Sequence, residues 1–308
     1  LQDTSTLLIK DAFNVYKAKP NKKKKSADTI KRQQAWFNSF IEWLNSNHKD
    51  IEYLNQITHK MADEYSGELY NQFTSATYNK RVSFFKTFFK KLKLDASLAH
   101  NVWDEVERLI NDTEISREPL TYEEFSKLLE AANGEWKTLI LIGFYTGLRL
   151  KDVALMKSTS VNILDSTINL TVAKTKYKLK QIPIYPQLLE AISSNYDANR
   201  EYLLPDIANQ YNQDVRKITD KVKELIKSIG LETNQERESG KRKASVRGFH
   251  SLRHTFVSMC AREGIPQSVV QSLVGTTTKA VMETYTHTSP EQKKDAIKLL
   301  PDVTELIK

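Results

Sequence analysis

Apolar residues recur at helical intervals through roughly the first third of the chain. In residues 29–45 they fall three and four positions apart, at Phe37, Phe40, Ile41 and Leu44. This spacing predicts an amphipathic helix that buries one face against a core. Two further stripes predict a second and a third helix: Met61, Tyr65 and Leu69, and then Tyr78, Val82, Phe85, Phe89 and Leu92 within residues 75–94.

The face of the third predicted helix opposite its apolar stripe is basic. It carries Lys80, Arg81, Lys86, Lys90 and Lys91. Such a run of charge is most simply a solvated surface, and the alternative is contact with the phosphates of a nucleic acid. The lysine run at 22–25 predicts a flexible loop with the same two interpretations.

The helical pattern breaks at Pro119. Proline has no amide proton and forces the residue before it toward extended geometry, so no helix runs through this point. Thr121 and Glu124 then have the Thr-x-x-Glu spacing of a capping box, which predicts the start of a new helix. We place the domain boundary here, with one domain over residues 1–117 and a second over residues 118–308.

The second domain mixes helices with a small amount of strand. Residues 136–147 are strongly apolar and predict a buried helix that ends near Gly147. Residues 166–185 alternate well enough to predict two strands joined by a lysine-rich turn. Beyond Pro186 the pattern is again helical, interrupted by the polar residues 232–248. The chain is therefore predicted to be mainly α with a small β-sheet, an α+β fold.

The composition is that of a globular protein with room for two cores. The chain has 308 residues, of which 40% are hydrophobic and 27% charged. Its longest apolar stretch, residues 138–145, is far too short to cross a bilayer, and no charged-then-apolar leader opens the sequence. The single cysteine, Cys260, excludes an internal disulfide and is typical of a reducing compartment, so we expect a cytoplasmic protein. The sequence begins at Leu1 rather than at a methionine, so the question of a further domain before it stays open.

The charge balance favours a polyanionic partner. The net charge is +8 and the pI is near 9.2. Residues 1–118 hold 19 Lys and Arg against 16 Asp and Glu, and the remainder holds 27 against 22. Because both halves are modestly basic, the sequence predicts a protein that grips its partner with two lobes.

Residues 248–256, GFHSLRHTF, concentrate cationic groups in little more than one helical turn. A zinc site is disfavoured: His250 and His254 have i, i+4 spacing, but the glutamate of His-Glu-x-x-His is missing and Arg253 would repel the ion. Two interpretations remain. One is a core histidine satisfied by hydrogen bonds, and the other is a grip on a phosphate, which suits a buried arginine well.

Two other segments supply candidate chemistry. Arg149 follows Gly147, where the buried helix ends and a side chain can enter a cleft, and Asp152 three residues later can hold its guanidinium. Tyr285 and His287 lie in a polar stretch further along the chain. Each of these segments is weak evidence by itself. The chain has 13 tyrosines, and any one of them is more often a packing residue than a catalytic one.

In this order, the segments resemble the catalytic domain of the tyrosine recombinases, which include the phage and mobile-element integrases. The matching motifs are TGLR at 146–149, AKTK at 173–176, HSLRH at 250–254, VG at 274–275 and YTH at 285–287. The resemblance covers residues from about 120 to 290 by motif. It extends more loosely to the preceding domain, whose third predicted helix is similar to the family's DNA-binding helix.

The resemblance implies a reaction, the integration or excision of a mobile element by DNA strand exchange. Tyr285 is the expected nucleophile, which attacks a DNA phosphodiester to give a 3′-phosphotyrosyl link and a free 5′-hydroxyl. Arg149, Arg253 and His250 are expected to hold the non-bridging oxygens while negative charge grows on them.

Lys174, in the turn between the two predicted strands, matches the family's general acid for the leaving 5′-oxygen. Lys176 and Lys178 stand close by in the sequence and compete for that role. Asp152 and His287 are expected to support the site, and His254 is expected either to lie behind it or to belong to the core. Arginines in place of a metal ion, and a covalent link that keeps the energy of the broken bond, imply that the reaction uses no metal and no other cofactor.

The resemblance further implies double-stranded DNA as the partner, held at specific attachment or core sites by a C-shaped clamp. The expected DNA-binding residues are Lys80, Arg81, Lys86 and Lys176. Homodimers that join into a homotetramer on two DNA sites are expected, with accessory DNA-bending proteins as further partners and no membrane. The apolar tail beyond Pro290 either closes its own domain or docks on a neighbouring subunit, and both alternatives stay open.

Thr276 departs from the family, which usually has histidine or tryptophan at this point. A threonine hydroxyl donates only one hydrogen bond, and loss of one transition-state donor costs about 10²–10³ in rate. Thr276 is either natural, with His287 or a water filling in, or an introduced change. Thr276 leaves open a catalytically weakened DNA-binding regulator of the same fold. A second alternative to a recombinase is an enzyme like the type IB topoisomerases, which share the Tyr-Arg-His-Lys chemistry.

Overall fold

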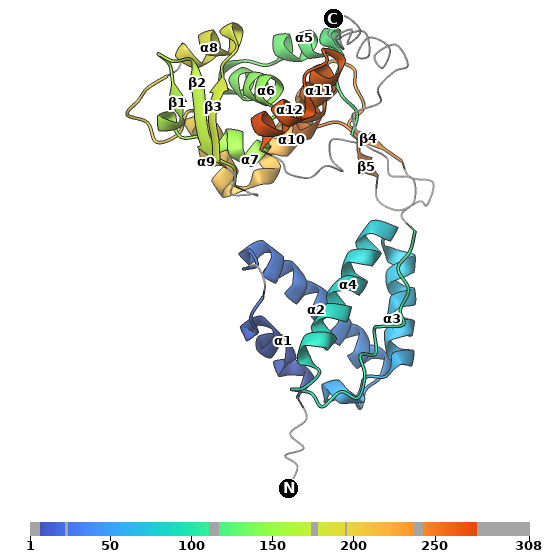
Figure 1. Ribbon diagram of the computed structural model, residues 1–308. Coiled ribbons are helices and arrows are strands. Elements are labelled where there is room, and N and C mark those ends of the chain that lie inside the picture. Colours follow the sequence, from blue (N-terminus) through green and yellow to red (C-terminus); the bar gives the residue numbers. More distant parts are fainter. Residues whose placement is uncertain are drawn as a thin grey trace, which may run out of the picture. The chain divides into compact units, whose positions relative to one another are not determined.

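The computed structural model describes residues 7–21, 24–110, 117–173, 178–194, 196–236 and 243–275. These residues form two compact units, the first of residues 7–110 and the second of residues from 117 onward (Figure 1). Each unit has its own hydrophobic core. Within the described ranges, no helix combines the length and the apolar character needed to cross a membrane.

The first unit is helical in all the elements described. It contains α1 (Ile9–Ala18), α2 (Ala27–Asn47), a 3-10 turn (Leu54–Gln56), α3 (His59–Gln72) and α4 (Ser75–Leu92). The predicted apolar stripes lie on α2, α3 and α4. Most of their residues are buried in the core, and Ile41 and Met61 pack at its edge. The three helix predictions are therefore confirmed.

Aromatic rings fill the core of this unit. Phe85 of α4 stacks on Trp103, with the ring centroids 4.4 Å apart and the planes 14° from parallel. Phe40 of α2 packs edge-on against both rings. Buried aromatic pairs add about 0.5–1.5 kcal/mol beyond their area burial. These contacts therefore hold α2 and α4 together and fold the segment after α4 back over them.

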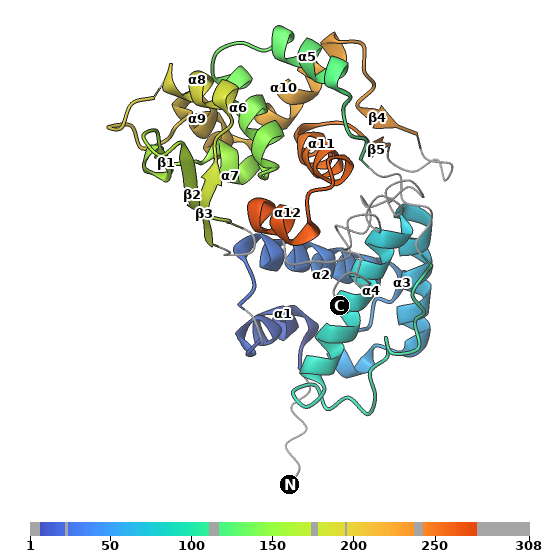
Figure 2. The same cartoon turned by 45° about the horizontal axis from the view of Figure 1, so that its top comes forward.

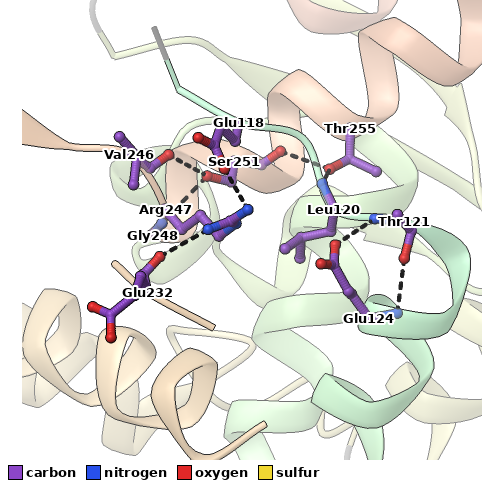
Figure 3. Close-up of polar contacts among 10 residues, drawn as sticks. All are labelled: Glu118, Leu120, Thr121, Glu124, Glu232, Val246, Arg247, Gly248, Ser251 and Thr255. Carbon is purple, nitrogen blue, oxygen red and sulfur yellow. Dashed lines mark hydrogen bonds and ion pairs between the residues drawn. The ribbon is translucent and has the colours of Figure 1, made fainter. Parts of the chain in front are cut away.

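The second unit carries the remaining helices. They are α5 (Tyr122–Ala131), α6 (Gly134–Thr146), α7 (Leu150–Ala154), α8 (Pro186–Ser193), α9 (Pro205–Gln213), α10 (Val215–Ser228), α11 (Phe249–Arg262) and α12 (Gln267–Val274). The predicted capping box starts α5. The Glu124 amide donates to Thr121 Oγ1 at 3.1 Å, and the Thr121 amide donates to Glu124 Oε2 at 2.8 Å (Figure 3).

Helix α6 is buried in the second core, as its apolar sequence predicted. In both views it lies between the three-stranded sheet and α11 (Figures 1 and 2). The helix ends at Gly147, which adopts the left-handed conformation (φ 59°). A side chain on Gly143 would meet α11, because a Cβ there would lie 2.7 Å from Phe249 Cζ and 2.9 Å from Leu252 Cδ1. Glycine at this position lets the two helices approach closely.

The sheet consists of β1 (Val161–Asn162), β2 (Thr167–Thr171) and β3 (Lys178–Pro183), which follow a 3-10 turn at Ser158–Ser160. The strands are antiparallel in the order β1-β2-β3, and Ile168 of β2 pairs with Ile182 of β3. The two strands predicted within residues 166–185 are therefore confirmed. A second, short antiparallel pair, β4 (Asn234–Gln235) and β5 (Ala244–Ser245), precedes α11. The fold is mainly α with small β-sheets, as predicted.

Candidate active site

Helix α11 carries three of the predicted site residues within its first turns. His250, Arg253 and His254 are spaced i, i+3 and i+4, so they lie along one face of the helix. The start of the helix is fixed by Ser251, whose Oγ accepts from the Gly248 amide at 3.3 Å and donates to the Val246 carbonyl at 3.4 Å (Figure 3). A well-defined first turn fixes where these side chains project.

Arg253 joins α11 to the ends of two other helices. Its side chain is only 6% exposed. Nη1 donates to the Gly147 carbonyl at the end of α6, at 2.7 Å, and to the Val274 carbonyl at the end of α12, at 3.0 Å. Two carbonyl acceptors leave the arginine charged and orient its planar guanidinium. Arg253, which the sequence predicted to bind a phosphate, therefore also holds the fold together through these two hydrogen bonds.

Arg149 lies at the N-cap of α7, directly after the Gly147–Leu148 corner. It is half-buried, and its Nη1 is buried without a hydrogen-bond partner among the described residues. A buried donor without an acceptor costs about 1–3 kcal/mol, and native proteins retain few of them. An anion bound beside Arg149 would supply the acceptor.

Asp152 belongs to the same cluster, but its hydrogen bond differs from the one predicted. The carboxylate is buried, and Oδ1 accepts from the Ala173 amide at 2.7 Å rather than from Arg149. Burial raises the pKa of Asp152, and the Ala173 bond and the charges of Arg149 and Arg253 act against that rise. Asp152 therefore lies near both arginines and anchors the end of β2 that leads to position 174.

The two histidines are held neutral. Burial, followed by the charge of Arg117, lowers the pKa of both His250 and His254 to about 4. At neutral pH each ring therefore carries one N–H donor and one acceptor nitrogen. Within the described residues, no three His, Cys, Asp or Glu side chains are grouped as metal ligands.

The remaining predicted catalytic residues, Lys174, Lys176, Thr276, Tyr285 and His287, lie outside the described residues, as does the tail beyond Pro290. The chain next to two of them is described. Gly275, just before Thr276, has a left-handed backbone (φ 63°), and a Cβ there would lie 2.7 Å from Val172 Cγ2. Val172 is two residues before Lys174. The segments that lead to Lys174 and to Thr276 therefore pass side by side.

Two features of the site were missed by the sequence reasoning. One is Arg117, whose charge acts on both histidines. The other is the close approach of Gly275 to Val172. The basic character of Arg117, two residues before the boundary proline, was the only signal in the sequence, because a contact made by folding has no local pattern.

The predicted DNA-binding residues of the first unit differ in their surroundings. Lys80 is exposed and lines a groove between α2 and α4. Arg81 instead turns inward: its guanidinium lies 3.9 Å from the centroid of the Phe73 ring, and it hydrogen-bonds the Tyr65 side chain. Lys86 donates to the Asp104 carbonyl at 2.9 Å.

The groove beside Lys80 is lined by further cations. Its volume is about 890 Å³, and its basic lining residues are Lys25, Arg32, Lys80 and Arg108. Its described lining residues include no carboxylate. Cations from α2, from α4 and from the segments next to them therefore line one groove.

Sequence comparisons match this chain to recombinases. It is 27% identical over 272 residues to a XerC-like tyrosine recombinase of Caldanaerobacter subterraneus, covering 78% of this chain and 69% of that protein. It is 23% identical over 289 residues to a tyrosine recombinase of Thermosipho africanus, covering 89% and 94%. The integrase of Escherichia phage P2 is 26% identical over 182 residues, covering 59% of this chain and 46% of that protein.

Solved structures share the fold. A lambda integrase dimer bound to a COC′ core site aligns with a TM-score of 0.70 at 14% identity, covering 92% of this chain and 78% of that one. The Tn1549 transposon integrase in complex with transposon right end DNA aligns with a TM-score of 0.66 at 15% identity, covering 96% and 99%. The sequence profile of the phage integrase family matches residues 118–292, which include α11 and its arginine. The chain belongs to the phage integrase family and is a tyrosine recombinase.

Proposed function

We propose that the protein is a site-specific DNA recombinase that cuts and rejoins strands through a 3′-phosphotyrosyl intermediate at Tyr285, for the integration or excision of a mobile element. The observation that carries this proposal is the convergence of Arg149 and Arg253 beside the neutral His250. Arg149 Nη1 is buried there without a hydrogen-bond acceptor among the described residues. A non-bridging phosphate oxygen fits this arrangement in both charge and hydrogen bonding.

The chemistry follows from these groups. The Tyr285 oxygen forms a bond to phosphorus, and the bond from phosphorus to the 5′-oxygen breaks. The phenol loses its proton, and Lys174 supplies one to the leaving oxygen, so the step needs no net proton. Arg149 and Arg253 stabilise the charge that grows on the non-bridging oxygens, and the N–H of neutral His250 donates to the same group.

Asp152 acts in this scheme by positioning. Its bond to the Ala173 amide fixes the backbone one residue before Lys174. Its negative charge lies close to Arg149 and Arg253. One carboxylate therefore links the expected general acid to the arginines. Val172 and Gly275 bring the chain before Thr276 to the same place.

The groove between α2 and α4 is the proposed DNA surface of the first unit. Lys25, Arg32, Lys80 and Arg108 line it and would contact phosphates. Arg81 and Lys86 are assigned a smaller part, because neither lines the groove and the Arg81 guanidinium packs on the Phe73 ring. Base reading falls to polar groups such as Gln33 and Thr87 in the same groove.

Assembly on DNA is proposed as two dimers that pair into a tetramer. The solved structures with this fold include a lambda integrase dimer on a core site and a lambda integrase tetramer bound to a Holliday junction. Cyclic symmetry would let each subunit present its tail to a neighbour. Accessory DNA-bending proteins would act on the sequences that flank the core sites.

The test is trapping of the covalent intermediate. Duplexes selected for binding from a random library would be nicked next to each candidate cleavage position, so that a short released fragment diffuses away and rejoining stops. We expect a denaturation-resistant adduct that maps to Tyr285 and is lost in Tyr285→Phe. Joining of two different duplexes separates a recombinase from a topoisomerase. An adduct at another residue, or strand exchange by Tyr285→Phe, contradicts the proposal.

A weakened DNA-binding regulator is the second candidate, because Thr276 replaces the family's usual histidine or tryptophan. Thr276→His restores a donor that the family uses in the transition state, so we expect it to raise the rate of strand cleavage, by up to about 10²–10³. The measurement is adduct formation in a single turnover. A Thr276→His variant no faster than the parent protein would count against a catalytic role for this position.

A further inference from the structure

Arg117 stands at a point where the chain is clamped against the start of α11. The Glu118 amide donates to the Val246 carbonyl at 3.0 Å, and the Glu118 carboxylate pairs with Arg247 (Figure 3). The Leu120 amide donates to Thr255 Oγ1 at 2.8 Å. Residue 120 is thus fixed to α11, and residue 118 to the segment between β5 and α11. The position of Arg117 is therefore set by its neighbours.

The guanidinium of Arg117 reaches the first turn of α11. Its Nη1 lies 3.7 Å from the position that a Cβ of Gly248 would occupy. After burial, the Arg117 charge is the largest influence that lowers the pKa of both His250 and His254. The side chain therefore faces the two histidines from the N-terminal end of the helix.

Three arginine charges consequently act on one small region. Arg149 and Arg253 also lower the pKa of His250. Asp152 accepts from the Ala173 amide, and the Glu118 carboxylate pairs with Arg247. Like charges gathered in a partly buried region repel one another, and a bound anion relieves that repulsion.

We infer that Arg117 is a third phosphate-binding arginine of the site. It binds a backbone phosphate of the DNA strand at the first turn of α11, beside the phosphate that Arg149 and Arg253 hold. This inference rests on the proposed function. Arg117 takes no part in bond making or breaking. It holds the strand in place through a charged hydrogen bond.

The first test compares Arg117→Gln with Arg200→Gln on a 30-base-pair duplex of arbitrary sequence. Arg200 is an exposed arginine of the same unit that pairs with Asp197, so it serves as the control. We expect Arg117→Gln to weaken binding about tenfold at 0.1 M KCl and to lower the slope of log K against log salt by about one. We expect Arg200→Gln to match the parent protein.

Two further readouts separate a phosphate contact from a structural role. In the free Arg117→Gln protein, the His250 and His254 pKa values followed by NMR should rise, because a nearby positive charge is gone. In the parent protein, phenylglyoxal should modify Arg117 when DNA is absent and not when the duplex is bound. This second readout needs no variant to fold.

Equal modification of Arg117 with and without the duplex would overturn the inference. So would an Arg117→Gln protein that binds with the parent's affinity and salt slope. If the Tyr285 adduct still forms in either case, the proposed function stands and only this inference is lost. Absence of any Tyr285 adduct, with the Arg117 effects present, would instead overturn the proposed reaction and leave the phosphate contact.

Discussion

Arg149 and Arg253 carry the same charge at the same site, but their hydrogen bonds within the protein differ. Arg253 Nη1 satisfies the carbonyls of Gly147 and Val274. Arg149 Nη1 has no acceptor among the described residues. The first arginine therefore contributes to both stability and chemistry. The second carries a desolvation cost in the absence of DNA, which is typical of a binding group.

Replacement of each arginine by methionine should separate these contributions. Arg253→Met strands two buried carbonyls, so we expect a loss of about 1–3 kcal/mol in the free energy of unfolding. Arg149→Met removes a buried unpaired donor, so we expect stability equal to or above that of the parent. Both should slow strand cleavage by about 10²–10³. Urea unfolding and adduct formation measure the two effects. An Arg149→Met variant as unstable as Arg253→Met would contradict this view.

His250 and His254 should make the protein sensitive to acid. In the unfolded chain a histidine takes up a proton near pH 6.5, but the folded protein keeps both rings neutral down to about pH 4. The unfolded state therefore binds more protons in this window. The stabilising contribution is complete above pH 6.5 and is lost as the pH falls toward 4.

The measurement is the urea midpoint as a function of pH for the parent, His250→Asn and His254→Asn. Each variant should show a shallower loss of stability between pH 6.5 and 4, because one proton-linked group has gone. Other acids titrate equally in all three proteins and cancel in the difference. Identical slopes in parent and variants would mean that the rings are not held neutral.

At this scale the sequence predicted the residue types of the site better than their partners. The order of motifs pointed to Arg149, Asp152, His250 and Arg253, and the structure brings them together. It did not predict that Asp152 bonds Ala173, or that Arg117 reaches the histidines. Those contacts join residues distant in the chain, and a single sequence has no periodicity that reports them.

Among the elements, the packing of α6 on α11 decides where the site residues stand. Gly143 allows that packing, because a Cβ would lie within 3 Å of Phe249 and Leu252. We expect Gly143→Ala to destabilise the protein by about 1–3 kcal/mol through overpacking. It should also slow cleavage, because α11 must shift to make room.

Gly67 in α3 provides the matched control. A Cβ at Gly67 would meet nothing within 4 Å, so Gly67→Ala should gain about 0.5–1 kcal/mol from helix propensity. Thermal unfolding and single-turnover cleavage of both variants test the contrast. A Gly143→Ala protein with the parent's stability would show that α6 and α11 can accommodate a methyl group between them.

Element boundaries followed from local chemistry wherever that chemistry was strong. The Thr121–Glu124 capping box and the alternating residues 166–185 each predicted elements that form, and the buried helix ends at Gly147 as predicted. The inward turn of Arg81 was not predictable, because a basic residue on a helix normally faces water. Its guanidinium is stabilised by aromatic neighbours on α2, on α3 and at the C-cap of α3, namely Trp36, Tyr65 and Phe73.

At the scale of the whole molecule, positive charge occurs in both units but is arranged differently in each. In the second unit, Arg117, Arg149 and Arg253 lie near His250, where we expect adjacent phosphates of one strand to bind. In the first unit, Lys25, Arg32, Lys80 and Arg108 are spread along a groove of about 890 Å³. A spread of charge suits several phosphates of a duplex, and each contact releases counterions when DNA binds.

DNA affinity should therefore respond to charge in the groove but not to charge elsewhere on the first unit. We expect Arg32→Gln, Lys80→Gln and Arg108→Gln each to reduce the slope of log K against log salt by about one. Lys60→Gln is the matched control, since Lys60 lies on α3 with its side chain 85% exposed and does not line the groove. Fluorescence anisotropy with a labelled duplex from 50 to about 200 mM KCl covers the range in which such contacts are resolved. If Lys60→Gln changed the slope as much as Lys80→Gln, the first unit would bind DNA through its overall charge, and the groove would have no special part in holding it.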